Sequence, residues 1–207
     1  MIPLDENANW CFSGGADGSD LQWGMTAGKK GHGVIHWSFL GHKSSAPMQE
    51  IVILPQDQLD TGDPYCALAN KTLKRRWPPK NIHVGNLLRR NWFQVCFSSS
   101  CYAVSDFKQP EGTIIPIDGV LKKGKVQGGT AWAVQMFIDR HNGEACKCYV
   151  FDQKLCYWFE WRSEWVRIYE PPAPEGMWAG IGTRDLNQIG KLAIRTLMNY
   201  NPNKKDI

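Results

Sequence analysis

The sequence predicts an α/β fold: a doubly wound, mainly parallel, Rossmann-like sheet flanked by helices, with a small antiparallel meander at one edge. Two observations support this fold class. Strand-like and helix-like segments alternate along most of the 207 residues, which is typical of βαβ units. Three predicted strands also end in glycine turns that lead into helical patterns, as strands do at the carboxyl edge of an open parallel sheet.

The first half of the chain is expected to supply two strands, three helices and one further apolar segment. Short apolar runs predict strands at residues 10–13 and 34–39, and residues 51–54 fit either a short strand or a buried turn. Apolar residues at helical spacing predict helices at residues 19–30, 65–77 and 84–97. Gly31 and Gly33 end the first of these helices, and Pro78-Pro79 end the second.

The second half repeats the alternation with one addition. Strands are predicted at residues 101–105, 149–152 and 177–181, and helices at residues 131–140 and 186–198. A long glycine-containing connection, residues 108–125, is of the kind that often borders a site. Residues 156–161 and 165–169 read as short strands that pair as an antiparallel edge meander.

Composition indicates one ordinary globular domain that spans residues 1–207. The chain is 43% hydrophobic and 21% charged, and it is long enough for one buried core but short for two. No apolar run approaches the roughly 20 residues that cross a bilayer, so we expect no membrane partner and a cytoplasmic location. A net charge of +4 permits an anionic partner without indicating a dedicated nucleic-acid binder.

The seven cysteines are expected to be reduced thiols, because an odd number without regular spacing does not suit a disulfide framework. Cys146, Cys148 and Cys156 could serve as three zinc ligands, but the paired spacing and the fourth ligand of a structural zinc site are missing. We therefore expect neither a metal nor a cofactor.

The first glycine turn, Ser13-Gly14-Gly15-Ala16-Asp17-Gly18, joins the first strand to the first helix. Glycine lets a ligand approach the main chain closely, and the free N–H groups and dipole at a helix start favour an anion. Two further glycine turns also lead into predicted helices: Gly128-Gly129-Thr130 and Gly182-Thr183-Arg184-Asp185. Because strand carboxyl ends share one edge, the three turns are predicted to face one crevice.

The first turn resembles a motif of the SLOG superfamily, the Rossmann-like group that includes DprA-type proteins and LOG-type nucleotide hydrolases. That motif reads Ser-Gly-Gly-Ala-x-Gly-x-Asp, and residues 13–20 follow it. Gly128-Gly129-Thr130 resembles part of the second glycine-rich phosphate turn of the LOG branch. Gln127 stands where that branch has proline, and its glutamate is absent from the following helix. The resemblance implies a nucleotide-related ligand bound by main-chain amides.

Several side chains are candidates for the site, and each also has a structural reading. Asp20 and His42 are the candidates for proton transfer, although Asp20 also suits a first helical turn. Arg89 and Arg90 suit bidentate phosphate pairing but also an exposed helix face. His36 alternates with bulky residues and fits a core position better than a catalytic one.

These observations lead to two hypotheses of different classes. In the first, the protein binds a nucleotide or a nucleotide-derived phosphorylated ligand, of the ADP-ribose type for example; if it is an enzyme, the expected reaction is cleavage of an N-glycosidic or phosphate bond. In the second, it is a non-catalytic ligand sensor or a DprA-like nucleic-acid-binding module, which its mild charge favours less. A homo-oligomer stays open, because the tryptophan-rich meander offers apolar surface, although an intramolecular core is the simpler use of it.

Overall fold

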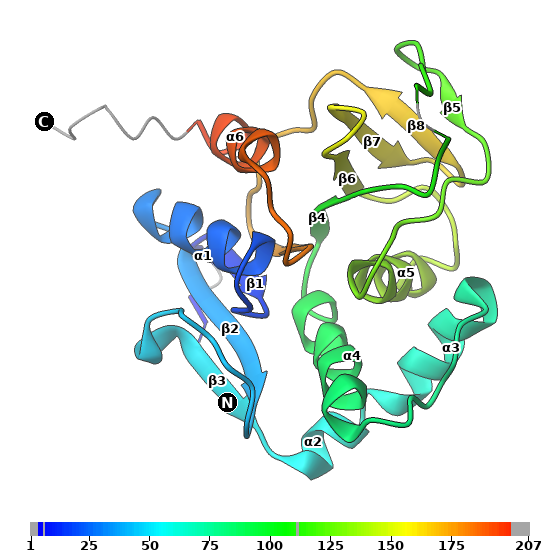
Figure 1. Ribbon diagram of the computed structural model, residues 1–207. Helices are drawn as coiled ribbons and strands as arrows, with labels where there is room; N and C mark the ends of the chain where they lie inside the picture. The colour runs from blue at the N-terminus through cyan, green and yellow to red at the C-terminus, as the bar shows by residue number, and fades with distance from the viewer. Residues whose placement is uncertain (1–3, 6, 111, 200–207) are drawn as a thin grey trace, which may run out of the picture.

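A computed structural model describes residues 4–5, 7–110 and 112–199, and its strands form one mixed sheet. The strand order is β3-β2-β1-β9-β4-β6-β7-β8-β5. The strands from β3 to β6 in this order are parallel, and β7, β8 and β5 add to the β6 side in antiparallel fashion. The predicted fold class, including the antiparallel edge, is therefore confirmed (Figure 1).

The described strands lie close to their predicted positions. They are β1 (Trp10–Ser13), β2 (Gly33–Phe39), β3 (Ile51–Leu54), β4 (Ser100–Ser105), β5 (Val120–Leu121), β6 (Cys148–Asp152), β7 (Tyr157–Trp161), β8 (Trp165–Ile168) and β9 (Met177–Gly182). Residues 51–54 thus form a strand rather than a buried turn. The two-residue strand β5, inside the long connection, was not predicted.

The helices are α1 (Ser19–Lys29), α2 (Gln56–Asp60), α3 (Asp63–Leu73), α4 (Ile82–Val95), α5 (Thr130–Arg140) and α6 (Gln188–Leu197), with a 3-10 turn at Met48–Glu50. The expectation that the third glycine turn leads directly into the last helix was wrong. A loop follows β9, and α6 begins only after Asn187, whose side chain accepts a hydrogen bond from the Gly190 N–H. Asparagine is a favoured N-cap residue, which explains the later start.

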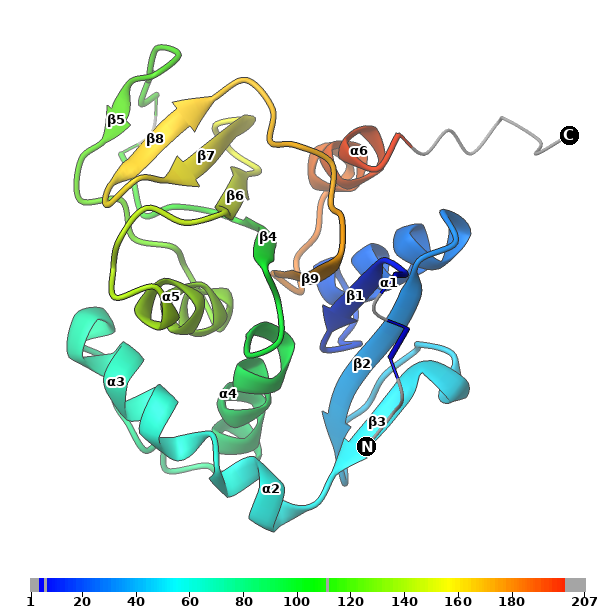
Figure 2. The same ribbon diagram turned by 180° about the vertical axis from the view of Figure 1, so that it is seen from behind.

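Helices cover both faces of the sheet (Figures 1 and 2). One core lies under α1 and α6, a second lies under α3, α4 and α5, and a small third cluster contains Phe39, Leu54 and Leu59. The alternation of side chains in β4 shows how one strand serves both cores. Cys101 and Ala103 pack on the side of α5, whereas Tyr102 and Val104 pack on the side of α1 and α6.

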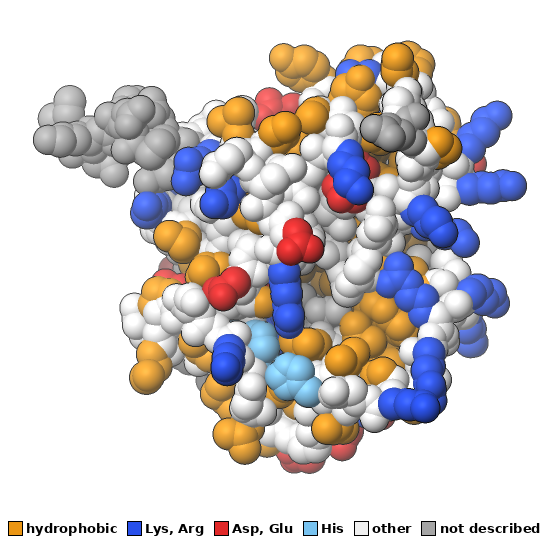
Figure 3. Space-filling model, viewed as in Figure 1, with side chains coloured by type: hydrophobic (Ala, Val, Ile, Leu, Met, Phe, Trp, Pro, Cys, Tyr) orange, Lys and Arg blue, Asp and Glu red, His pale blue; other side chains and the backbone are white. Residues whose placement is uncertain are grey.

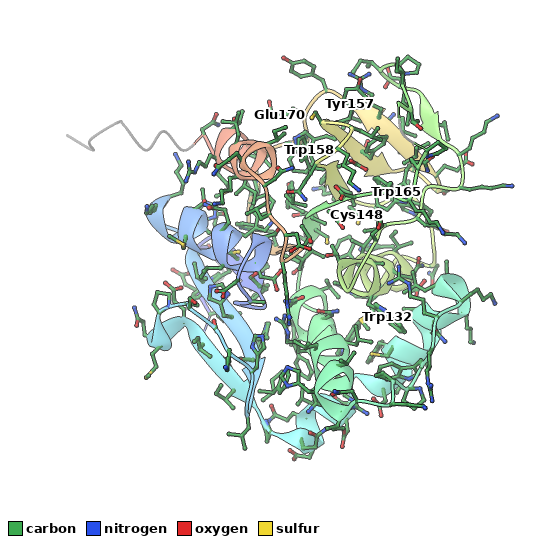
Figure 4. The ribbon with its side chains drawn as sticks, in the orientation of Figure 1. Trp132, Cys148, Tyr157, Trp158, Trp165 and Glu170 are labelled. Atoms are coloured by element: carbon green, nitrogen blue, oxygen red, sulfur yellow. The ribbon has the colours of Figure 1, made fainter. Side chains whose placement is uncertain are left out.

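The tryptophans of the meander belong to the core. Trp165 belongs to the same hydrophobic cluster as Trp132 of α5, and Trp158 belongs to the cluster on the side of α6; the three residues are labelled in Figure 4. Trp158 is 5% exposed and Trp165 is 4% exposed. These two rings are therefore buried within the chain itself, as the simpler of the two readings expects.

The middle of the sheet sets the position of the site. The chain proceeds outward from β1 to β2 and β3 on one side, and from β4 to β6 on the other. Strand β9 returns to the middle and pairs with both β1 and β4. The strand order reverses here, and ligands in open parallel sheets bind beyond the carboxyl ends of the strands at such a reversal.

Candidate functional site

A cleft of about 460 Å³ opens beyond the carboxyl ends of the central strands. It is lined by Ala16 after β1, by Asp106 after β4, by residues 127–130 before α5 and by residues 182–185 after β9. Apolar and polar side chains of α4 form another wall of the cleft. In Figure 3 this face is hollowed, with hydrophobic side chains at the border and histidine side chains beside it. Residues from all three glycine-turn segments therefore contribute to one cleft.

A buried ion pair lies in the wall of this cleft. Arg90 Nη2 is 3.3 Å from Asp20 Oδ2, and the Gly182 N–H donates to Asp20 Oδ1 at 2.9 Å. Burial raises the pKa of the Asp20 carboxyl, and the Arg90 guanidinium and the Gly182 N–H oppose that shift. Because both carboxylate oxygens accept hydrogen bonds, Asp20 links α1 to α4 and β9. This geometry supports a role for Asp20 in positioning the wall of the cleft.

Gln94 extends this network to the first glycine turn. Its amide oxygen accepts from the Gly14 N–H at 2.7 Å and from Arg90 Nη1 at 3.1 Å, and its nitrogen donates to Asn91 Oδ1. The opposite amide orientation would leave the oxygen facing acceptors only. A Cβ added at Gly14 would lie 1.4 Å from Arg90 Nη1. Glycine is thus required here because protein side chains approach the backbone.

The first turn is packed mainly against the protein itself. Ser13 is fully buried, and its hydroxyl donates to the Asp20 carbonyl. Gly18 lies against the Thr183 and Arg184 backbone, and the Ser19 N–H donates to the Thr183 carbonyl at 2.9 Å. Of this predicted turn, Ala16 lines the cleft and Asp17 lines a second, adjoining pocket. The lining of the two cavities does not include Ser13, Gly14, Gly15 or Gly18.

The second turn, in contrast, is open. Gly128 and Gly129 have no neighbour within 4 Å of an added Cβ among the described residues. Gly128 adopts a φ of +63°, which glycine tolerates better than other residues. No side chain caps α5, which starts at Thr130, and all three residues of the turn line the cleft. The N-terminus of α5 therefore offers N–H groups and a positive dipole end to a ligand.

Three arginines near the second turn have different partners and different positions relative to the cleft. Arg75 donates to the Gly128 carbonyl at 2.5 Å and to the Val126 carbonyl at 3.1 Å. Arg90 lines the cleft and is 5% exposed. Arg89 instead pairs with Asp63, with Nε 2.5 Å from Oδ1, and lies outside the cleft lining. Of the two neighbouring arginines predicted on α4, the structure therefore brings only Arg90 to the cleft.

In the third turn, Gly182, Thr183 and Arg184 all line the cleft. The Thr183 hydroxyl accepts from the Asp185 N–H at 3.1 Å, which holds the loop locally. Because α6 begins at Gln188, its N-terminus does not directly follow this turn. Its contribution is the backbone of Gly182 and the exposed guanidinium of Arg184.

His42 lies in the adjoining pocket of about 290 Å³, together with Asp17, His83 and Arg184. Its Nδ1 is 2.9 Å from the Ser38 hydroxyl. Burial, with further contributions from Arg90, Arg184 and His83, lowers the pKa of His42 to about 4. The ring is therefore neutral at pH 7 and is a weak base, which supports a hydrogen-bonding role better than proton abstraction.

Sequence reasoning missed Asn91, Gln94 and Asp106, which also line the cleft. Gln94 stands one helical turn after Arg90, so their shared face could have been inferred from the spacing. Asp106 directly follows a buried strand, which is the position where site residues of parallel sheets occur.

Neither a metal site nor a membrane span is found in the part of the chain that the structure describes. No three histidine, cysteine or acidic side chains there are arranged to hold a metal ion, and no helix there is both long and apolar enough to cross a bilayer. Comparison with family models, with curated proteins and with solved structures gave no match. The likeness to the SLOG superfamily rests on the sequence motifs and stays a prediction.

Proposed function

We propose that the protein binds a nucleotide or a nucleotide-derived phosphorylated ligand in the cleft at the carboxyl edge of the sheet. The observation that carries this proposal is the open N-terminus of α5, which shares the cleft with the buried Arg90. A helix N-terminus contributes about 0.3–1 kcal/mol toward an anion at an exposed position and up to about 2 kcal/mol when partly buried. Arg90 places a guanidinium in the same wall, where Asp20 balances its charge.

The remaining lining suits the other parts of a nucleotide. Val84, Leu87 and Leu88 of α4 form an apolar side on which a base can pack. Asp106 and Asn91 provide polar groups for sugar hydroxyls. The cleft volume of about 460 Å³ falls within the range of roughly 300–1,000 Å³ that is usual for small-molecule sites.

Binding receives more support than hydrolysis. The two residues predicted for proton transfer are Asp20, whose oxygens accept hydrogen bonds from Arg90 and Gly182, and His42, whose pKa is about 4. Cleavage of an N-glycosidic or phosphate bond is tested by incubating the protein with AMP and ADP-ribose and separating the products by chromatography. If the protein binds the nucleotide and leaves it unchanged after prolonged incubation, the result favours a ligand sensor over a hydrolase.

The experiment that tests binding is a thermal-shift screen with AMP, NAD, ADP-ribose and sugar phosphates, with adenosine as the phosphate-free control. At a ligand concentration of about 100 times Kd, binding adds about 2.7 kcal/mol to stability. For a chain of this size the shift in Tm is roughly 5–10 °C. The proposal requires a shift by a phosphorylated compound that adenosine does not reproduce. A screen in which every phosphorylated compound leaves Tm unchanged refutes it.

One surface favours nucleic-acid binding as a second candidate function. Residues 71–80 hold five cations and no acidic residue, and the cations are exposed: Lys71, Lys74, Arg75, Arg76 and Lys80. Such a segment suits a phosphate backbone. Binding of a fluorescent single-stranded oligonucleotide that weakens steeply between 50 and 200 mM salt supports this function. Absent or salt-independent binding rejects it.

A further inference from the structure

The second pocket, of about 290 Å³, directly adjoins the cleft. Ala16 and Arg184 line both cavities, so that the two lie side by side. The rest of its lining comes from the turn after β1, from the segment after β2 and from the first turn of α4. A ligand seated in the cleft can therefore extend past Arg184 into this pocket.

Unpaired cations distinguish this pocket. Arg184 and Lys43 are exposed, and neither makes a hydrogen bond or an ion pair within the described part of the chain. Asp17 is the acidic residue in the lining, and it makes no ion pair with a described cation. The two cations thus outnumber the one acid, which favours an anionic occupant.

Two histidines complete the pocket and are held in place by one aromatic ring. The His42 ring stacks on Phe39 with a centroid distance of 5.3 Å, and the His83 ring meets the same Phe39 edge-on at 5.2 Å. His42 Nδ1 is 2.9 Å from the Ser38 hydroxyl, and His42 Nε2 is buried without a partner in the described structure. A hydroxyl that donates to Nδ1 leaves the proton of the neutral ring on Nε2, where it is an unused donor.

The local electrostatics agree with the geometry. The charges of Arg90, Arg184 and His83 lower the pKa of His42, in addition to burial, and Asp17 opposes them only in part. The potential at His42 is therefore positive. An anion placed beside these groups would offset that potential and raise the pKa of His42.

We propose that the ligand carries two separate anionic groups, one at the N-terminus of α5 and a second in the pocket formed by Lys43, His42, His83 and Arg184. This inference rests on the proposed function and deepens it. The class of ligand is a nucleotide extended by a second phosphorylated group, so that the nucleoside between the two groups spans the region beside Arg184. A nucleoside monophosphate fills only the cleft.

The test compares AMP with the dinucleotide pApA, whose two phosphates are separated by one nucleoside, by titration calorimetry. The wild-type protein should bind pApA at least tenfold more tightly than AMP. A Lys43→Gln/His83→Gln variant, whose changes lie in the second pocket only, should lose this advantage and keep its AMP affinity within about twofold. Lys122→Gln, which removes an exposed cation outside both cavities and outside residues 71–80, is the matched control and should behave as wild type.

NMR titration of the His42 ring gives an independent reading. Its pKa should rise by at least one unit when pApA is bound and much less when AMP is bound. The inference is overturned if AMP binds but pApA gains nothing, or if the advantage of pApA survives in the Lys43→Gln/His83→Gln variant. If neither compound binds to the folded protein, the proposed function fails as well.

Discussion

Replacement of Gly14 by alanine should disrupt the ion pair in the wall of the cleft. The new Cβ would lie 1.4 Å from Arg90 Nη1, and ordinary contact begins at about 3.4 Å, so the guanidinium must move by about 2 Å. Arg90 Nη2 is already 3.3 Å from Asp20 Oδ2, and a displacement of this size separates the pair. Breaking a buried ion pair costs about 3–5 kcal/mol, which is the expected loss in the free energy of unfolding.

Urea unfolding of four proteins measures this effect. Gly14→Ala is made in the wild type and in an Asp20→Asn/Arg90→Met background, where no charge is left unpaired and methionine can adapt its shape. In that background the same change should cost only about 1 kcal/mol, because what remains is the cost of crowding. The coupling between Gly14 and the pair should therefore be at least about 2 kcal/mol.

Gly28→Ala is the control for the chemistry of the substitution. Gly28 lies in α1 and is exposed, and an added Cβ would meet its nearest neighbour at 3.8 Å. Alanine should stabilise the helix here by about 0.5–1 kcal/mol. Equal costs of Gly14→Ala in the two backgrounds would refute the reasoning, since the substitution would then act independently of Arg90.

Two further predictions concern pH and the second glycine turn. Burial and Arg90 lower the pKa of His36 from 6.5 to about 4, although Glu50 Oε2 lies 3.6 Å from its Nε2. The contribution of the neutral His36 ring to stability is therefore complete above about pH 6.5 and is lost as the pH falls toward 4. His36→Gln should reduce the slope of the unfolding free energy against pH by about 1 kcal/mol per pH unit near pH 5. An unchanged slope contradicts this prediction. Arg75→Ala removes the guanidinium that holds the Gly128 and Val126 carbonyls, and AMP affinity should fall about tenfold in calorimetry, a change of about 1.4 kcal/mol. The exposed Arg76→Ala should leave affinity unchanged, and equal losses in both variants would assign the effect to general charge rather than to the turn.

Most of the fold could be predicted because its strands are continuous apolar runs and its helices have clear periodicity. The missed elements lack these signals. Helix α2 has five residues, of which Leu59 alone is buried, and the two-residue strand β5 exists only through its pairing with β8. The start of α6 could have been placed from Asn187, whose side chain is a favoured N-cap.

The site was predictable in its location but not in its internal contacts. Strand carboxyl ends share one edge, and this rule brought three distant turn segments to one cleft. The close approach of Arg90 to Gly14 joins residues 76 positions apart, and no local pattern signals it. Similarly, Arg89 and Arg90 are adjacent in sequence, but one step along a helix turns them to different partners, Asp63 and Asp20.

The central claim, that a phosphorylated group binds at the open N-terminus of α5, is tested most directly at Gly129. Its φ of −65° suits any residue, and an added Cβ meets nothing within 4 Å in the described structure, so Gly129→Asp and Gly129→Asn should both fold. The two side chains have nearly the same shape and differ in charge. Calorimetry with the phosphorylated nucleotide that gives the largest thermal shift should show at least a hundredfold loss of affinity for the aspartate variant and about tenfold for the asparagine variant. Equal affinities of the two variants would contradict the claim, because a bound phosphate at this position must respond to a neighbouring carboxylate.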